Sequence, residues 1–552
     1  MGGITVTITN TASGAMPQIA SVVAVDVSKE FNRIPRAEIV LIDGGLAVPG
    51  FPLSDDPFFN PGEEIQISLR HEGAPESEAV LFVGIVVKQR VRADCTGTYL
   101  NVSLKDKAVG LTHGRRSVLH KELTDTDIIK AIIGEKGLSP GIVDPTTATH
   151  PEMTQFNSSD WDFIILRAEA NGLLVGVDDG VVSAKKIDLS TAPIYSFEYG
   201  LDSISNFDIE ADSELQFAAV QSTAWSIADQ ALTAPTEGAD MPLKQGASLF
   251  SPPDIGTTLG NESLLHSNPV PLLPEELQAW ADNSIQRARL AFIRGSLTVP
   301  GVGDIKPFDI ITVAGMGDKF NGNALVSGVR HRVTVEGGWV TDIQLGLSAE
   351  SHASKFCASE PQASGLLPGI QGLHIGVVAA FEEDPEKELR VKTILPGVGE
   401  AADTIWARLA SPDAGVGRGF FFRPEVGDEV VVGFFNNDPR QAVILGSLYS
   451  SKNTPFDDWA AATEDNQFKG IASKLGARIE FIDGDAPQII IATPGGNYIN
   501  LDENGGAMEL ADQNGNIILM DANGITITSA GDFIVDAASG NVEISGSAID
   551  LV

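Results

Sequence analysis

The end of the chain repeats a short pattern of apolar and polar positions. Between residues 496 and 552, two apolar residues separated by one other residue recur every seven to ten positions. This spacing predicts short β-strands that turn both apolar side chains to the same face. The pairs are Ile499/Leu501, Met508/Leu510, Ile518/Met520, Ile525/Ile527, Phe533/Val535, Val542/Ile544 and Ile549/Leu551.

Three of the intervening turns share the sequence Asp-x-Asn-Gly, at residues 502–505, 512–515 and 521–524. Asn-Gly favours the positive φ that a tight reversal between antiparallel strands requires. Calcium-binding nonapeptide β-rolls are an alternative interpretation of these aspartates. Their Gly-Gly-x-Gly-x-Asp cadence is missing here, so we expect neither a metal nor another cofactor.

This repeat offers too little apolar surface per strand to fold alone. No helix follows to cover the pairs, and a lone meander leaves its edges open. Several identical chains wound about one axis would remove those edges, so we predict an intertwined triple-stranded β-helix, a homotrimer. An ordinary meander packed on the preceding domain is the alternative. The predicted core is Ile499, Leu501, Met508, Leu510, Ile518, Met520, Ile525, Ile527, Phe533, Val535, Val542 and Ile544.

The charge of the chain is strongly negative. The formal net charge is −37, and residues 479–552 contain twelve carboxylates with no Lys, Arg or His. A surface of this kind repels nucleic acid and anionic lipid headgroups. We therefore expect no nucleic-acid partner, and contact with a membrane only if another force drives it.

The first 365 residues predict a mainly β unit with some α-structure. Alternating segments predict one small barrel in residues 1–115 and a second at about 295–350. Between them, helices are predicted from a Thr124 cap, from Ser158 or Ser159 to before Gly172, and from Pro274 onwards. Residues 240–273 are rich in Pro, Ser and Gly and predict a long excursion.

The remaining sequence predicts three further parts. Five short apolar strands in residues 366–450 are typical of a Greek-key barrel of the OB type. Residues 451–473 are predicted to be a loose connector, and the repeat domain is predicted to span residues 474–552.

The sequence carries no recognisable catalytic constellation. It lacks CxxC, HExxH, GxSxG and GK[ST] motifs, and its eight His residues are scattered. His331 is interpreted as structural, residues 382–384 as a solvated acidic loop, and Arg418 as a partner of acidic neighbours. We therefore expect a protein that is not an enzyme.

Targeting signals are also missing from the sequence. The first ten residues have no basic region followed by an apolar one, and no apolar run reaches 18 residues. We expect synthesis and assembly in the cytoplasm without a signal peptide.

Several segments resemble the VgrG spike proteins of contractile injection systems, which are similar to a fusion of the hub and spike proteins of contractile phage tails. The most specific are residues 406–420 (WARLASPDAGVGRGF) and 423–430 (RPEVGDEV) in the OB segment. Residues 154–160 (TQFNSSD) resemble the hub helix, residues 320–331 the closing hub strands, and residues 474–483 the start of the needle. Residues 32–38 (NRIPRAE) look more like extracellular or phage-tail-like particles than type VI secretion.

This resemblance implies a trimeric spike on a phage-like baseplate. It would join a six-fold inner tube of Hcp-like protein to a three-fold needle, pierce a target envelope on sheath contraction, and then be released or fired from the cell. A PAAR-repeat tip protein would cap Ile549, Asp550, Leu551 and Val552, and effector cargo is an additional candidate partner. The 25 or so residues before the needle leave no room for a cell-wall-cleaving domain, and no toxin domain follows it, so we expect a bare spike.

Two alternative functions remain open. One is a trimeric tail fibre or adhesin that binds glycans, and the other is an envelope hydrolase hidden in the hub.

Overall fold

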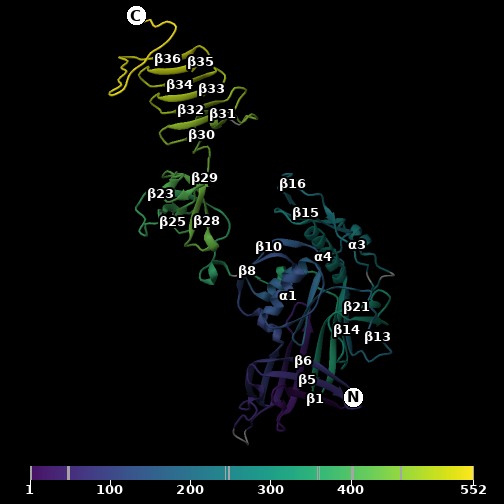
Figure 1. Cartoon of the computed structure of the whole chain (residues 1–552). Helices are drawn as coiled ribbons and strands as arrows, with labels where there is room; N and C mark the ends of the chain where they lie inside the picture. Colours follow the sequence, from purple (N-terminus) through teal and green to yellow (C-terminus); the bar gives the residue numbers. More distant parts are fainter. Residues whose placement is uncertain are drawn as a thin grey trace. The chain divides into compact units, whose positions relative to one another are not determined.

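The chain divides into two compact units, residues Met1–Glu360 and Pro361–Val552, each described here by itself (Figure 1). The computed structural model describes residues 3–45, 50–242, 244–246, 249–356, 358–359, 361–399, 403–460 and 463–550. Strands predominate in both units, as the sequence predicts.

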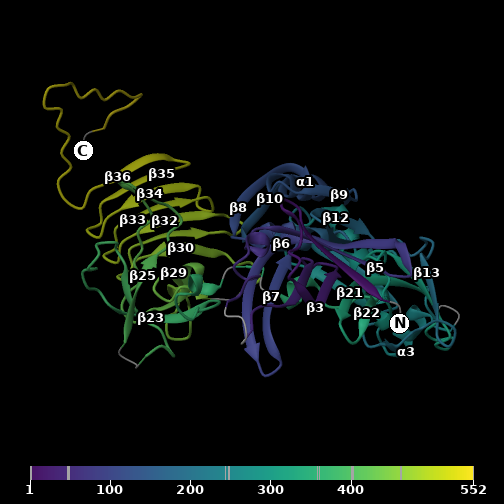
Figure 2. The same cartoon turned by 90° about the horizontal axis from the view of Figure 1, so that it is seen from below.

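A 13-stranded sheet forms the framework of the first unit, in the order β14-β19-β22-β21-β3-β4-β7-β6-β5-β1-β2, with β20 on β21 and β13 on β20 (Figure 2). Strands from both predicted barrels belong to this one sheet, because β21 pairs antiparallel with β3. Two separate apolar cores remain, one around Phe82 and Ile39 and one around Leu297 and Ile343. The strands are β1 Ile4–Asn10, β2 Gly14–Ala15, β3 Ser21–Glu30, β4 Arg36–Ile42, β5 Glu64–His71, β6 Ala74–Asp94, β7 Gly97–Lys105, β13 Tyr195–Glu198, β14 Asn206–Ala211, β19 Ile293–Pro300, β20 Ile310–Ala314, β21 Gly322–Thr334 and β22 Gly338–Leu345.

An α+β part lies between these segments in sequence. Thr124 and Asp127 cap α1 reciprocally, and the Ser159 hydroxyl accepts from the N–H of Asp162 at the start of α2. Gly172, with φ of +69°, follows the end of α2. The predicted helix boundaries are thereby confirmed. The elements are β8 Arg116–Thr124, α1 Asp125–Glu135, β9 Ser139–Val143, β10 Thr149–Ser158, α2 Asp160–Ala170, β11 Leu173–Asp178 and β12 Val181–Lys186.

Residues 240–273 are more regular than their composition predicts. They contain a short helix and a strand that pairs parallel with β15, so the predicted excursion carries regular structure of its own. A Pro-rich start suits the first turn of a helix, which is where Pro252 lies. The elements from here to the end of the unit are β15 Ala219–Ser226, β16 Ala231–Leu232, β17 Thr236–Glu237, α3 Pro252–Thr258, β18 Ser263–Asn268, α4 Pro274–Phe292 and α5 His352–Lys355.

The second unit begins with a closed five-stranded barrel, in the order β23-β24-β25-β29-β28. Its interior is filled by small and branched side chains such as Val378, Ala407, Val432 and Ile444. Five strands in this segment were predicted, and all five form. They are β23 His374–Ala380, β24 Val391–Ile394, β25 Thr404–Leu409, β28 Glu429–Phe434 and β29 Ala442–Ser447, with a small hairpin of β26 Ala414–Gly415 and β27 Arg418–Gly419.

The C-terminal sheet is a meander of seven antiparallel strands, each five residues long (Figure 1). Its first strand, β30, lies inside the predicted connector, so the sheet starts earlier than residue 474. The strands are β30 Phe468–Ala472, β31 Arg478–Ile482, β32 Gln488–Ala492, β33 Tyr498–Asp502, β34 Ala507–Ala511, β35 Ile517–Asp521 and β36 Gly524–Thr528.

Candidate assembly interface

The register of the C-terminal sheet lines up its apolar pairs into two continuous rows. Positions two and four of successive strands face one another, as in Ile499↔Leu510 and Leu510↔Ile518. Since alternate residues of a strand share a face, both rows lie on one side of the sheet. We call this side the apolar face. Its residues are Ile471, Ile479, Ile491, Ile499, Leu510, Ile518 and Ile527 in one row and Phe481, Ile489, Leu501, Met508, Met520 and Ile525 in the other.

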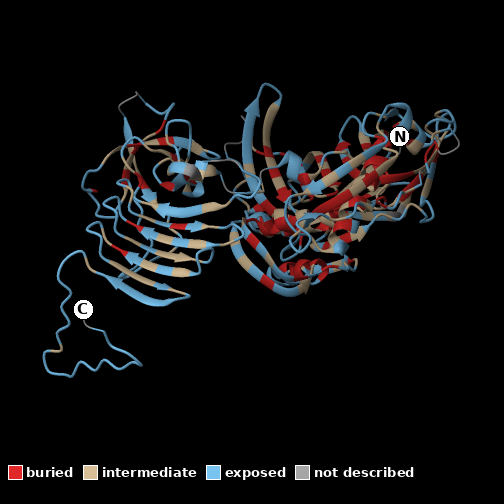
Figure 3. Cartoon of the chain, turned by 90° about the horizontal axis from the view of Figure 1, so that it is seen from above, coloured by how far each residue is buried: buried red, intermediate tan, exposed pale blue. Residues whose placement is uncertain are grey.

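Within the described residues, most of the apolar face is exposed. Met508 is 51% exposed and Ile525 is 69% exposed, and only Leu501 and Ile518 are half-buried. Figure 3 shows the exposed and intermediate residues running along these strands, in contrast to the buried interior of the first unit. A contiguous exposed apolar patch marks an interaction surface or an aggregation hazard.

Eight of the twelve predicted core residues meet on this face, from Ile499 to Ile527. The sequence interpretation missed its upstream half, although Ile479/Phe481 and Ile489/Ile491 show the same spacing. A search for apolar pairs that began before residue 496 would have found them.

The last predicted pairs do not form strands. Within the described residues, no strand follows β36, so Phe533, Val535, Val542, Ile544 and Ile549 lie outside strands in the single chain, and their places in a trimeric needle stay a prediction. An apolar pair supplies a face but no hydrogen-bonding partner, and a strand needs both. Phe533 nevertheless lines, together with Leu510, Ile518 and Ile527, a hollow of about 470 Å³. Asp550 is exposed, and Leu551 and Val552 lie outside the described residues.

The aspartates of the Asp-x-Asn-Gly turns bind their own backbone. Asp502 accepts from two N–H groups, those of Asn504 and Gly505, at 2.8 and 3.0 Å. The positive φ of that turn falls on Gly506 rather than on the predicted Gly505, whereas Gly515 and Gly524 have it as predicted. Hydrogen bonds from the side chain and backbone of Asn516 lower the pKa of Asp512 to about 2. Within the described ranges, no three His, Cys, Asp or Glu side chains gather as metal ligands do.

The base of the sheet is anchored by the segment that was predicted to be a loose connector. The indole of Trp459 donates to Glu480 on β31 at 2.8 Å, and its ring lies where a side chain on Gly470 would be. Arg478 stacks on Phe456, 5.1 Å from the ring centroid. Two of the three aromatic residues of this segment, Phe456 and Trp459, make these contacts.

The loops of the five-stranded barrel are held by arginine–carboxylate pairs. Arg418 donates to Asp413 at 2.6 Å, which confirms the predicted acidic partner. Asp384 was predicted to be solvated and is instead buried, because it accepts from Arg390 and from the N–H groups of Glu386 and Glu388. The hydrogen bonds from Arg390 hold the pKa of Asp384 far below its ordinary value.

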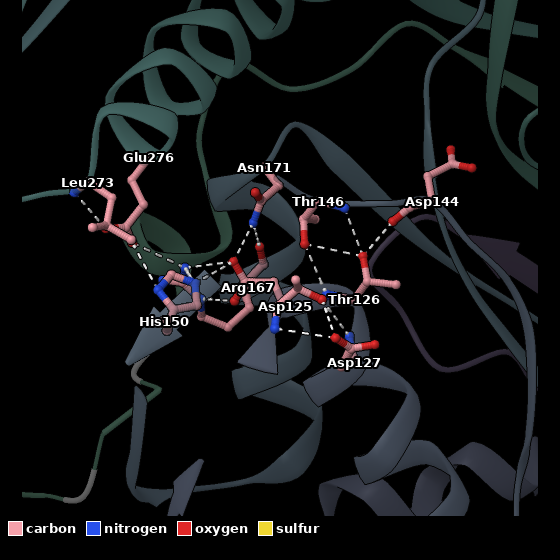
Figure 4. A network of polar contacts seen from close by, with 11 residues as sticks. Asp125, Thr126, Asp127, Asp144, Thr146, His150, Arg167, Asn171, Leu273 and Glu276 are labelled. Carbon is pink, nitrogen blue, oxygen red and sulfur yellow. Dashed lines mark hydrogen bonds and ion pairs between the residues drawn. The ribbon is translucent and has the colours of Figure 1, made fainter. Parts of the chain in front are cut away.

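The first unit contains a buried polar network that resembles a catalytic cluster in composition (Figure 4). Asp125 is fully buried and accepts from Arg167 at 2.6 and 2.9 Å, from His150 at 3.0 Å and from Asn171 at 2.8 Å. Burial raises the pKa of Asp125, but the hydrogen bonds and charge of Arg167 outweigh it and lower the pKa.

Every strong donor in this network is directed at Asp125, so the carboxylate is saturated. Glu276 on α4 completes the cluster, at 3.6 Å from Arg167 and 3.7 Å from His150. The network therefore joins α1, β10, α2 and α4, and its geometry suits a structural tie better than proton transfer.

His331 is also structural, as the sequence predicts. It is buried in β21 and its Nδ1 lies 3.1 Å from the hydroxyl of Thr341. Burial lowers the pKa of His331 to about 3, so the ring stays neutral in the folded chain. In the described part of the chain, no helix combines the length and apolar character needed to cross a membrane.

Comparisons with known proteins give matches over both units. Residues 2–335 match the family described as the Alg8 N-terminal domain, and residues 374–449 match the type VI secretion system/phage-baseplate injector OB domain. The actin cross-linking toxin VgrG1 of Vibrio cholerae is 34% identical over 104 residues, which make up 18% of this chain and 9% of that protein's length.

Two solved structures are similar at lower identity. The tail protein from Neisseria meningitidis MC58 is 17% identical, with a TM-score of 0.47 over 63% of this chain and 97% of its own. The E. coli c3393 protein, described as a component of the type VI secretion system, is 12% identical, with a TM-score of 0.40 over 80% of this chain and 99% of its own. The resemblance to VgrG-type spike proteins is confirmed, and the chain belongs to the family that carries the Alg8 N-terminal domain, followed here by a phage-baseplate injector OB domain.

Proposed function

We propose that three copies of this chain form the structural, non-catalytic spike at the tip of the inner tube of a contractile injection system. The observation that carries this proposal is the apolar face, with two unbroken rows of side chains exposed on one side of the C-terminal sheet. Three such faces turned toward a common axis would bury the rows and close the open edges of the sheets.

The first unit would supply the hub of this spike. Two of the four apolar clusters described in the first unit fall in the segments of the two predicted barrels, and six such modules in a trimer would suit a junction between a six-fold Hcp-like tube and a three-fold needle. Baseplate proteins and the tube are the proposed neighbours, and the needle would meet a membrane only by mechanical puncture. The particle would assemble in the cytoplasm and act outside it, with effector cargo as a further passenger.

The tip would be capped by a PAAR-repeat protein. Ile549 is 52% exposed and Asp550 lies beside it, so three copies would present a small apolar platform at the end. A chain truncated after Gly540 is expected to keep its oligomeric mass and lose co-purification with a co-expressed PAAR protein. A cap that still co-purifies in full amount contradicts this assignment.

Electron microscopy of the purified full chain tests the proposal as a whole. The expected particle is a broad hub that narrows into a straight rod of three-fold symmetry. A chain whose C-terminal sheet folds back on its own hub, with no rod, contradicts it.

The rival functions have separate tests. Phe533 is 63% exposed in the single chain, and an exposed aromatic near the tip is what a glycan-binding fibre needs. Saturable binding on a glycan array that is lost in Phe533→Ala would favour the fibre. Release of soluble fragments from peptidoglycan by the purified chain would favour a hydrolase instead.

A further inference from the structure

A cavity in the first unit has a volume of about 700 Å³, within the range of ligand-binding pockets. It lies between β3, the start of β4, the end of β7, the first turn of α2 and α5. Asn32, Arg33, Ile34 and Arg36, from the NRIPRAE segment, are among the residues that line it. The spike proposal does not use this cavity.

Two cations face each other directly across the strands that line it. Arg36 on β4 pairs in register with Lys105 on β7, and both are exposed into the cavity. Like charges at directly opposed positions are destabilising. Among the described residues, neither side chain has an ion pair or a side-chain hydrogen bond that would offset the repulsion.

Neighbouring cations on the same sheet are paired. Arg330 lies in the same row of the ladder, opposite Ser28, and binds Asp26 at 3.0 Å. Arg332 binds Asp342 at 2.6 Å. Arg36 and Lys105 lie directly opposite each other on adjacent strands, and neither has a carboxylate partner among the described residues, so an external anion would offset their repulsion.

A third cation and an aromatic wall complete the cavity. The guanidinium of Arg33 lies 4.5 Å from the ring centroid of Phe356, which fixes it by a cation–π contact and leaves its N–H donors free for an acceptor. Trp161 and Phe356 both line the cavity and supply apolar surface beside the charges.

The carboxylates at this site leave a positive surplus. Asp162 is occupied by the Ser159 hydroxyl at 2.6 Å and by His352 at 2.9 Å. Glu30 accepts from the Ser28 hydroxyl at 3.3 Å. These two acids disfavour a densely charged polyphosphate, whereas single carboxylates spaced along a peptide can each meet one cation.

We propose that this cavity binds an acidic segment of a partner protein, through carboxylates held by Arg33, Arg36 and Lys105 and apolar groups packed on Trp161 and Phe356. The occupant is a different protein, whose carboxylates would complement the three cations that line the cavity. The proposal is independent of the spike assignment and survives if that assignment fails.

The test uses the full chain and a fluorescently labelled peptide of alternating glutamate and glycine as the probe. Fluorescence anisotropy should give saturable binding that weakens at high salt and at least about tenfold in Arg36→Gln or Lys105→Gln. The control is Arg90→Glu, at an exposed position of β6 outside the cavity, which should bind like the unaltered chain. Because each Gln variant removes a repulsive pair, its thermal unfolding temperature should not fall.

Three results would overturn the proposal. The first is equal binding of a peptide with glutamine in place of glutamate, or an equal loss in Arg90→Glu. The second is preferential binding of inorganic tripolyphosphate, which would make the site one for phosphate. The third is a change in the oligomeric mass of the free chain in the Gln variants, which would mean that another copy of this chain fills the cavity.

Discussion

The two large sheets of this protein are built from the same alternating pattern of apolar and polar residues. Only in the first unit are the apolar side chains of the sheet buried by other parts of the same chain. In the first unit, alternate residues such as Ile39, Leu41 and Phe82 are fully buried by other parts of the same unit. In the C-terminal sheet, equivalent positions such as Leu510 and Met520 stay exposed. Alternation therefore predicts which side chains share a face, but not whether the same chain can cover that face.

The difference comes from what surrounds each strand. The strands of the first unit are up to 21 residues long, and residues of the connection between β4 and β5, such as Leu53, Phe58 and Phe59, pack into their apolar core. The C-terminal strands are five residues long and connected by tight turns, and most of their apolar face stays exposed, although Phe533 lines a hollow beside it. The account of the spike depends on other copies covering that face.

The largest expected effect is on assembly. Ile518→Asp would bring one carboxylate per chain into the proposed shared core, where an uncompensated charge costs several kcal/mol. We expect the trimer to dissociate while the first unit stays folded, as measured by sedimentation and circular dichroism.

Thr526→Asp is the matched control, because Thr526 lies on the opposite face of the next strand, in register with Leu519. It should keep the trimer. Dissociation by both variants, or by neither, contradicts the role of the apolar face.

The next largest expected effect is on the stability of the first unit. Phe82→Ala should destabilise the first unit by about 3–5 kcal/mol, because it empties a fully buried site. The oligomeric mass should not change. Urea unfolding measures the loss, and Val91→Ala, at an exposed position of the same strand, should stay within about 0.5 kcal/mol of the unaltered chain.

A smaller expected effect is a pH dependence of the free energy of unfolding that the two units do not share. Burial lowers the pKa of His331 to about 3 from an ordinary value of 6.5, so between these values the unfolded chain binds a proton that the folded chain does not. The free energy of unfolding of the first unit should therefore fall as pH falls from 6.5 towards 3, by about 1.4 kcal/mol per unit.

Residues 479–552 have no histidine, so the C-terminal sheet should not share this dependence. His331→Gln should flatten the profile in this range, whereas His113→Gln, at an exposed position, should leave it unchanged. An unaltered slope in His331→Gln would show that another group is responsible.

The smallest effect is local. The hydroxyl of Thr124 caps α1 by accepting from the N–H of Asp127 at 3.2 Å. Thr124→Ala removes this cap and should destabilise the first unit by about 1 kcal/mol. Thermal unfolding measures it, and Thr124→Ser, which keeps the hydroxyl, should restore most of the loss.

Local signals in the sequence predicted local structure well. Thr124, Ser159 and Gly172 marked helix ends because capping depends on neighbours in sequence, and the five barrel strands followed from short apolar runs between turns. The pairing of β21 with β3 was not predictable in this way, since it joins residues some 300 positions apart. Nor was the docking of Trp459 on β31, which depends on the space that Gly470 leaves.

The mass of the full chain in solution tests the central claim most directly. Sedimentation equilibrium should give about three times the 58.2 kDa of one chain, at micromolar concentration and physiological salt. A single-chain mass with the C-terminal sheet still ordered, as judged by hydrogen exchange of residues 488–528, would contradict the account.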